Sequence, residues 1–379
     1  MRIMVTGGGT GGHTSPAVAV LEELYRRDSR LAVQWVGRTK SIEERISEAM
    51  SIPFRSLPAE GWPRTRSVRR LWVGAKMAWS LARAWVYIKK FRPQLVFGVG
   101  GYVSLPLMWV AQRMGIPTVI HEQNQLLGVA NRLLAPKATR IFLSFPETRG
   151  NYPKDKATLV GNPVRAAFKN PSDKAAARKA LELDANVPVV LITGGSQGAR
   201  RLNDAVIEML PSFGASEAQF IWATGNADAA RARDAAGAAP ARVITHAFIQ
   251  DMATVCAAAD VMVCRSGAST TAEIAVMRKP SVLIPFPFAT DNHQEHNAKA
   301  FEEAGAAVLL HDADCTGEKL GETLRTLLCD SGRLSAMANA AGMLARPDAA
   351  EAIADGILSI VFAGEQSPAR QSSGESSFE

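Results

Sequence analysis

The chain has 379 residues, of which 47% are hydrophobic and 21% are charged, which is ordinary globular composition with room for two domains. Four cysteines without CxxC spacing exclude a disulfide framework and a zinc-ribbon site, and indicate reduced thiols in a cytosolic protein. The net charge of +7 is uneven: residues 61–121 hold ten Lys or Arg and no Asp or Glu, whereas the rest is slightly acidic. This asymmetry predicts an anionic partner for the first half.

The first half alternates short apolar runs with helical patterns, which predicts βαβ units and a parallel sheet. We expect strands near 2–6, 31–36, 95–99, 117–121 and 140–144, and helices near 15–28, 41–50, 68–90, 103–114 and 126–134. Residues 161–165 (GNPVR) resemble an interdomain link, since Asn-Pro resists helix.

The second half repeats the alternation. We expect strands near 188–193, 219–223, 242–245, 260–263 and 281–284, and a last helix over 349–361. The chain from 363 onward is rich in Ser, Gln, Glu and Gly, which predicts a disordered tail.

Two stretches share one build: residues 2–6 run into Gly7–Gly12, and 189–193 run into Gly194–Gly198. A continuous apolar run suits a strand buried on both faces, and a helix that starts after a glycine loop directs free N–H groups at an anion. The same arrangement occurring twice predicts two nucleotide-binding-type halves around a cleft. Residues 97–102 and 263–268 are similar strand-to-glycine junctions.

Gly7, Gly9 and Gly12 match G-x-G-x-x-G, but the next strand ends at Arg38 without the acidic residue that holds a nicotinamide ribose. An NADP site through Arg38 stays open, yet it does not explain the second glycine loop. We therefore favour phosphate or pyrophosphate binding.

Two histidines are candidates for chemistry. His13 lies where a helix starts, and the positive helix end keeps an imidazole neutral, so His13 could act as a general base or bind a ligand. His121-Glu122-Gln123-Asn124 follows a strand, at the sheet edge where ligands of open α/β sheets bind. Asn131 would share a helix face with Asn124. A metal at the His-Glu pair is disfavoured because no third ligand accompanies it.

Two polar runs mark the second half. Thr270 to Glu273 has the spacing of a capping box, and Glu273 could alternatively accept hydrogen bonds from ribose hydroxyls. Residues 291–294 (DNHQ) follow a predicted strand, which suits recognition of sugar hydroxyls as well as a plain loop.

The segment 68–90 has helical stripes of basic and aromatic residues. Lys76 and Arg83 share one stripe and Trp72 and Trp79 the adjoining one, which fits a helix lying on an anionic membrane surface. An ordinary amphipathic helix with a solvated basic face is the alternative. No nucleic-acid-binding module pattern accompanies the stripe.

Together these motifs resemble the MurG family of N-acetylglucosaminyltransferases, from about Arg2 to Val361. The similarity rests on GGTGGH at 8–13, FGVGGY at 97–102, HEQN at 121–124, GNPVR at 161–165, GGSQGAR at 194–200, SGAST…E at 266–273 and DNHQ at 291–294.

The resemblance implies the α/β GT-B fold, in which two Rossmann-like domains with parallel sheets face a central cleft. It implies an acceptor and membrane-associating domain over 1–162, a UDP-GlcNAc domain over 163–345, a helix over 346–362 that returns to the first domain, and a tail over 363–379. The activity implied is inverting transfer of GlcNAc from UDP-GlcNAc to the MurNAc 4-hydroxyl of lipid I, giving lipid II with a β-1,4 link.

The resemblance also assigns site residues. His13 would be the first candidate for the base, followed by Glu122 and His121. The acceptor would meet Thr10, His13, Tyr102 and Asn131. The donor would meet Thr10, Gly11, Gly12, Asn124, Arg165, Gly195, Ser196, Gln197, Asn203, Ala268, Ser269, Thr270, Glu273, Asp291, His293 and Gln294. Trp72, Lys76, Trp79 and Arg83 would contact the membrane.

No cofactor or metal would be required, although a divalent cation could stimulate turnover. The partners implied are UDP-GlcNAc, lipid I, an anionic membrane and other cell-wall synthesis proteins, with no nucleic acid, at the cytoplasmic face of the bacterial inner membrane. The alternatives are another GT-B transferase, a UDP-GlcNAc 2-epimerase, or a non-catalytic protein that binds nucleotide sugar or membrane.

Overall fold

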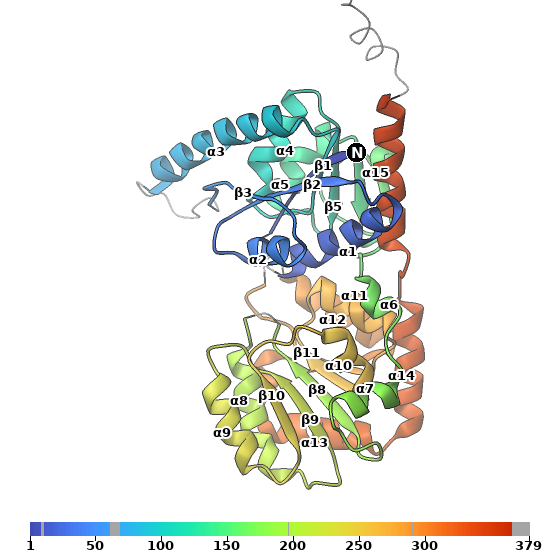
Figure 1. The fold of residues 1–379 in the computed structure, drawn as a ribbon. Helices are drawn as coiled ribbons and strands as arrows, with labels where there is room; N and C mark the ends of the chain where they lie inside the picture. Colours follow the sequence, from blue (N-terminus) through green and yellow to red (C-terminus); the bar gives the residue numbers. More distant parts are fainter. Residues whose placement is uncertain (9–10, 61–68, 196, 290–291, 366–379) are drawn as a thin grey trace, which may run out of the picture. The chain divides into compact units, whose positions relative to one another are not determined.

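A computed structural model describes residues 1–8, 11–60, 69–195, 197–289 and 292–365. The chain divides into two compact units, Met1–Pro163 with the segment from Asp348, and Val164–Pro347. The boundary therefore falls inside the GNPVR segment, beside the predicted position after residue 162. Each unit is a parallel α/β sheet covered by helices (Figure 1).

The first unit contains a seven-stranded sheet in the order β3-β2-β1-β4-β5-β6-β7. Its strands are β1 (Arg2–Thr6), β2 (Ala32–Gly37), β3 (Phe54–Ser56), β4 (Leu95–Gly98), β5 (Thr118–Glu122), β6 (Arg140–Leu143) and β7 (Ala157–Leu159). Its helices are α1 (Gly11–Arg27), α2 (Ile42–Ala49), α3 (Arg69–Phe91), α4 (Ser104–Arg113), α5 (Val129–Leu134) and α15 (Ala349–Glu365).

Alternate strand residues face opposite sides of this sheet, because successive side chains of a strand point to opposite faces. Ile3 and Val5 pack with α1 and α15 on one face. Met4 packs with α3 and α4 on the other face. Helix α15 lies against α1 and carries Asp355, which pairs with Arg27. The sheet is thus buried on both sides, as its nearly continuous apolar strands require.

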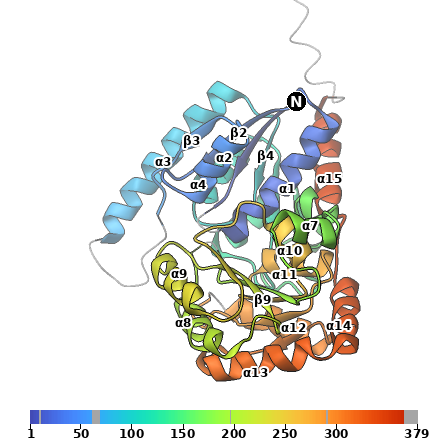
Figure 2. The ribbon, with the colours of Figure 1, turned by 60° about the horizontal axis from the view of Figure 1, so that its bottom comes forward.

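The second unit contains a six-stranded sheet in the order β10-β9-β8-β11-β12-β13. Its strands are β8 (Val189–Thr193), β9 (Gln219–Ala223), β10 (Val243–His246), β11 (Val261–Cys264), β12 (Ser281–Leu283) and β13 (Ala307–Leu309). Its helices are α6 (Ala166–Lys169), α7 (Lys174–Ala180), α8 (Arg200–Met209), α9 (Ala229–Ala238), α10 (Met252–Ala258), α11 (Ala268–Val276), α12 (His293–Glu303), α13 (Gly317–Leu328) and α14 (Ser331–Met343). Figure 2 shows α8 and α9 side by side at one side of this unit.

The predicted strands and helices are present, and three short strands were missed. Strands β3, β7 and β13 have three residues each and lie at sheet edges. Polar residues interrupt β3 and β7, whereas β13 is an apolar run that the sequence analysis overlooked. Two boundaries were wrong. Helix α5 begins at Val129 rather than near 126, and α15 continues to Glu365, so a tail starting at 363 overlaps the helix. The remainder of the predicted tail lies outside the described residues.

The strand order places both glycine loops at equivalent positions. In the first sheet β1 lies between β2 and β4, and in the second β8 lies between β9 and β11. The order therefore reverses beside β1 and beside β8, and open α/β sheets bind ligands where this reversal occurs. The loops after β1 and β8 are the two that the sequence singles out.

Candidate active site

In the first unit, the glycine loop after β1 and the loop after β4 touch. A Cβ added to Gly7, whose φ is +139°, would lie 2.4 Å from Val99 Cγ2. A Cβ on Gly101 would lie 2.6 Å from the carbonyl oxygen of Gly8. Only residues without a side chain allow this approach, so the glycines bring two loops together at the reversal point.

His13 is the third residue of α1, a helix that begins directly after the first glycine loop and has no acidic residue in its first turn. Gly11 and Gly12 are its first two residues. The structure does not describe the His13 side chain, and Thr10 lies outside the described residues. The predicted place of His13 at a helix start is confirmed, while its chemistry stays a prediction.

The carboxylate of Glu122 is buried and accepts four hydrogen bonds from its own loop. Oε1 accepts from Asn124 N at 3.0 Å and from Asn124 Nδ2 at 3.1 Å. Oε2 accepts from Gly128 N at 2.9 Å and from Asn131 Nδ2 at 2.8 Å. Glu122 is therefore arranged to fix the loop between β5 and α5. Asn124 and Asn131 meet through this carboxylate, and the expectation that they share a helix face is wrong because Asn124 precedes the helix.

The ring of His121 is fully buried and joins three segments of the first unit. Its Nε2 lies 3.2 Å from the carbonyl oxygen of Gly161 and 3.1 Å from Ser144 Oγ. Its Nδ1 lies 3.0 Å from Gln123 Nε2, a donor, which assigns the hydrogen to Nε2. This geometry ties the end of β5 to the GNPVR segment, a positioning role that the sequence did not indicate.

Two further residues support this edge of the sheet. Arg38 donates from Nη1 to the hydroxyl of Tyr102 at 3.0 Å, which connects the end of β2 to the loop after β4. Glu43 on α2 is fully buried, and a Cβ on Gly8 would come within 2.4 Å of its Cδ. The sequence reasoning missed Glu43. Its place as the second residue of α2, in an acidic first turn, gives no signal that the carboxylate faces a glycine loop.

In the second unit, the loop after β8 is built on glycines in left-handed conformations. Gly195 has φ +86° and donates to Thr193 Oγ1 at 3.2 Å. Gly198 has φ +77°, and a Cβ there would lie 2.4 Å from the carbonyl oxygen of Thr224. Gln197 is exposed on this loop, and Ser196 lies outside the described residues. Helix α8 follows at Arg200 without a side-chain cap, which leaves its first N–H groups for a ligand or water.

Helix α11 starts three residues earlier than the predicted capping box requires. It begins at Ala268 after the extended residue Gly267, and no side chain caps it. Thr270 is therefore the third helical residue, and the Thr270–Glu273 box is absent. Ala268 and Ser269 occupy the uncapped first turn, the position that suits an anionic group.

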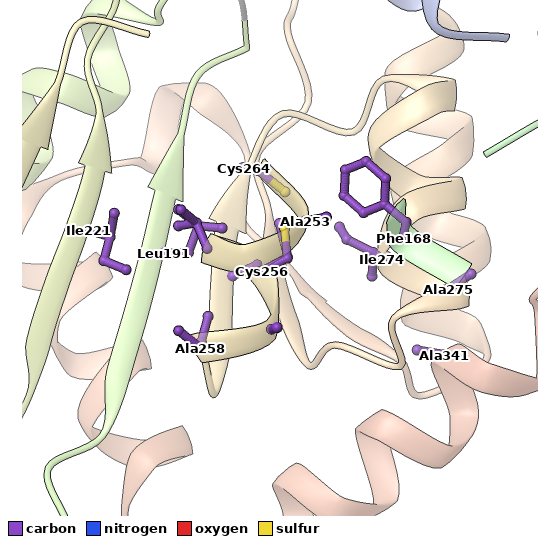
Figure 3. Packing of buried hydrophobic residues seen from close by; sticks show 14 of the residues in the cluster. Phe168, Leu191, Ile221, Ala253, Cys256, Ala258, Cys264, Ile274, Ala275 and Ala341 are labelled. Atoms are coloured by element: carbon purple, nitrogen blue, oxygen red, sulfur yellow. The ribbon is translucent and has the colours of Figure 1, made fainter. Parts of the chain in front are cut away.

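Glu273 lies on α11 beside an apolar cluster. Figure 3 shows the sulfurs of Cys256 and Cys264 in this cluster, with Phe168 and Ile274 nearby. Burial raises the pKa of Glu273 to about 7, and Arg165 opposes that rise. The Arg165 guanidinium lies 5.0 Å from the ring centre of Phe168. Arg165 and Glu273, both predicted to bind the donor substrate, therefore lie close enough for their charges to interact.

The other residues predicted to bind the donor substrate differ in burial and in hydrogen bonding. Gln294 accepts from Phe286 N at 2.9 Å through Oε1, and its carbonyl oxygen accepts from Ser266 Oγ at 2.7 Å. Asn203 is buried and bonded to Thr224 O, Asp228 and Trp222, so it supports the loop from within. His293 is the first residue of α12, and Asp291 lies outside the described residues.

Helix α3 exposes an apolar face, which we call the α3 apolar face. Its exposed members are Leu71, Trp72, Ala75, Ala78, Trp79, Ala82, Trp85 and Val86. Trp72 is 63% and Trp79 60% exposed. Lys76 and Arg83 are only partly exposed, and they contact Glu60 and Tyr87 respectively. The two cations therefore flank the aromatic face and turn toward the body of the unit.

Among the described helices, none is long and apolar enough to cross a membrane. Within the described ranges, no group of three or more His, Cys, Asp or Glu side chains is arranged to hold a metal ion.

Family models cover most of both units. Residues 3–143 match the glycosyltransferase family 28 N-terminal domain, and residues 189–353 match its C-terminal domain. With two parallel sheets and glycine loops at both reversal points, these matches define a two-domain glycosyltransferase of the GT-B class.

The finer relationship comes from whole-chain similarity. The chain is 38% identical over 353 residues to the UDP-N-acetylglucosamine--N-acetylmuramyl-(pentapeptide) pyrophosphoryl-undecaprenol N-acetylglucosamine transferase of Halalkalibacterium halodurans, covering 93% of this chain and 97% of the relative. It is 40% identical to the transferase of the same name from Nitratidesulfovibrio vulgaris, covering 95% and 98%. The crystal structure of Acinetobacter baumannii MurG superposes with a TM-score of 0.73 at 30% identity, covering 94% and 99%. The chain belongs to the MurG family.

One structural similarity concerns the alternative that the protein is a UDP-GlcNAc 2-epimerase. The UDP-GlcNAc 2-epimerase from Neisseria meningitidis has a TM-score of 0.65 at 15% identity, covering 95% of this chain and all of the epimerase chain. A likeness at this identity shows the shared fold alone.

Proposed function

We propose that this protein is an inverting transferase that moves GlcNAc from UDP-GlcNAc to the MurNAc 4-hydroxyl of lipid I, giving lipid II with a β-1,4 link for peptidoglycan synthesis. The observation that carries the proposal is the similarity over nearly the full length to transferases named for this reaction, with glycine loops in both units and uncapped helix starts in the second. Those features suit a reaction in which both substrates carry a diphosphate.

The donor belongs to the second unit in this proposal. The loop after β8 around Gly195, with Ser196 and Gln197, would receive the diphosphate together with the uncapped start of α11 at Ala268, Ser269 and Thr270. Glu273 would accept hydrogen bonds from the ribose, and Arg165 would offset the charge. Gln294, with His293 and Asp291, would meet the hydroxyls of GlcNAc.

The acceptor belongs to the first unit. His13 is our candidate for the base that takes the proton of the attacking 4-hydroxyl, and Thr10, Tyr102 and Asn131 would hold the acceptor. The hydroxyl oxygen forms a bond to the anomeric carbon, the bond from that carbon to the UDP oxygen breaks, and the configuration inverts. Glu122 and His121 are assigned positioning roles, because their polar atoms are engaged by their own loop and by Gly161.

We propose that no cofactor is required. Charge develops on the departing UDP diphosphate, and N–H groups at uncapped helix starts can stabilise such charge. A divalent cation that pairs with the diphosphate in solution could still stimulate turnover.

We also propose that the protein associates peripherally with the cytoplasmic face of the inner membrane. The α3 apolar face supports this, since contiguous exposed apolar patches mark interaction sites and tryptophan favours the depth of lipid headgroups. An unpaired apolar helix face beside an acid-free basic segment suits an enzyme whose acceptor is a lipid.

Transfer of radiolabelled GlcNAc from UDP-GlcNAc to a short-chain lipid I analogue tests the proposal, with wild type and His13→Ala run side by side. We expect labelled lipid II analogue from the wild type and a large loss in the variant. Conversion of UDP-GlcNAc to its 2-epimer without transfer would support the epimerase instead. Tight UDP-GlcNAc binding with neither product would indicate a non-catalytic protein.

A further inference from the structure

A small cavity in the first unit lies apart from the glycine loops, between α3 and the chain around β3. Its volume is about 250 Å³, and Arg38, Lys76 and Arg83 line it together with Glu60. Three cations face one carboxylate, so the lining has a net charge of about +2 if all four groups are ionised. We call this the α3–β3 cavity.

Lys76 and Arg83 both lie on α3, and Arg38 directly follows β2. Within the described residues, only the Lys76 side chain is paired with a carboxylate. Lys76 Nζ lies 2.5 Å from Glu60 Oε1. Arg83 donates to the hydroxyl of Tyr87 from Nε at 2.9 Å, and that hydroxyl donates to Ser56 O at 3.0 Å. Arg38 bonds to the hydroxyl of Tyr102. Across the described part of the chain, neither guanidinium group has a carboxylate within 4.0 Å, although the backbone N–H of Arg38 donates to Glu43 Oε1 at 3.2 Å.

This arrangement is electrostatically unfavourable without a ligand, because like charges lining one small space repel. Phenol hydroxyls orient a guanidinium without neutralising it, and an oriented guanidinium matches phosphate oxygens in a bidentate manner. The surrounding segment 61–121 contains no acidic residue that could compensate.

The cavity also adjoins the α3 apolar face. Lys76 Nζ lies 5.4 Å from the ring centre of the exposed Trp72. Lys76 thus belongs to both the cavity lining and the edge of the aromatic surface. A ligand with an anionic head could occupy the cavity while an attached apolar chain lies along the tryptophans.

We propose that the α3–β3 cavity binds a phosphate or diphosphate group, with Arg38, Lys76 and Arg83 as its ligands and Glu60 as the group that weakens it. The phosphate could belong to a lipid headgroup or to a soluble phosphate compound. This site goes beyond the proposed transfer reaction, because it uses none of the donor or catalytic residues. Its lipid alternative rests on the proposed membrane association, for which Lys76 and Arg83 were also predicted contacts.

The primary test is calorimetric titration of inorganic pyrophosphate into the full chain. Glu60→Gln should tighten binding, by up to about tenfold, because it removes the opposing charge and releases Lys76. Arg38→Gln with Arg83→Gln should weaken binding by about tenfold or more, as expected when charge-assisted hydrogen bonds are lost. Lys90→Gln removes one positive charge from the exposed end of α3 and should leave affinity unchanged.

Cosedimentation with vesicles distinguishes the two sources, using phosphatidylglycerol mixed with phosphatidylcholine against phosphatidylcholine alone. If Glu60→Gln and the double arginine variant shift both pyrophosphate affinity and binding to the anionic vesicles, the ligand is a lipid phosphate. If they shift pyrophosphate affinity alone, it is a soluble phosphate. Equal pyrophosphate affinity in Glu60→Gln, the arginine variant and Lys90→Gln would overturn the site, whether or not the transferase assay succeeds.

Discussion

Asn131 donates from Nδ2 to Oε2 of Glu122 over 2.8 Å, and both side chains are almost fully buried. This bond joins α5 to the end of β5, and the other oxygen of the same carboxylate binds Asn124. The pair therefore sets the shape of the loop that carries part of the HEQN motif. It explains why two residues implied for acceptor binding and catalysis are found facing each other.

Removing the hydrogen bond between Asn131 and Glu122 should lower the free energy of unfolding of the first unit. We expect Asn131→Ala to destabilise the first unit by about 1–3 kcal/mol, because a buried carboxylate oxygen loses a donor. At this domain size the melting temperature should fall by about 2–4 °C per kcal/mol. Glu122→Gln should lower stability further, since its amide NH₂ would face donors. Calorimetry checks this, and a kcat loss in Glu122→Gln at unchanged melting temperature would instead show a chemical role for Glu122.

The binding of the donor should depend on pH through Glu273. Burial raises the pKa of Glu273 to about 7, so part of the population is protonated near neutral pH. If the carboxylate accepts ribose hydrogen bonds, affinity for UDP-GlcNAc should fall by about tenfold from about pH 8 to about pH 6. Glu273→Gln should bind more weakly at high pH and lose this dependence. Identical pH profiles for the two proteins would exclude a ribose contact through this carboxylate.

From the raised pKa of Glu273 we also predict how the stability of the ligand-free protein depends on pH. The pKa of Glu273 is about 7 in the folded chain and 4.5 ordinarily. Between these two pH values the folded chain therefore binds more protons at this group than the unfolded chain does. The contribution of Glu273 is therefore most favourable below about pH 4.5 and declines as pH rises to about 7. Urea unfolding across this range should show a flatter profile for Glu273→Gln than for wild type. If stability changes with pH in the same way in wild type and Glu273→Gln, the pKa of Glu273 is not raised in the folded chain.

The second glycine loop should reject a side chain at Gly198. The φ of +77° and the 2.4 Å approach of Thr224 O both oppose a Cβ there. Gly305 is the matched control, since its φ is +74° and nothing lies within 4 Å of an added Cβ. Gly305→Ala should cost about 1–2 kcal/mol from its conformation alone, and Gly198→Ala clearly more. Equal unfolding free energies would show that the loop relaxes.

The α3 apolar face should control membrane binding without affecting folding. Trp72→Ser with Trp79→Ser should reduce vesicle cosedimentation severalfold and leave the melting temperature unchanged, because both rings are exposed. Phe248→Ser is the control, since Phe248 is 59% exposed in the other unit. If the tryptophan variant and the control cosediment equally with vesicles, α3 is not the contact.

The sequence by itself determined the fold class, the two glycine loops and the family. Runs such as residues 189–193 suit strands buried on both faces, and the glycines after them mark turns that other residues rarely adopt. The ordered motifs over nearly the whole chain then led to the MurG family.

Only the tertiary structure decided which groups face one another. The bond from His121 to Gly161 joins segments forty residues apart. The four donors on Glu122 come from nearby residues, but the path of their loop, like the start of α11 at Ala268, does not follow from residue spacing. The contacts of Lys76 with Glu60 and of Arg83 with Tyr87, at the edge of the α3 apolar face, are likewise set by packing. Helical periodicity gives the stripe on which a residue lies, whereas packing against β3 decides which stripe meets protein and which meets solvent.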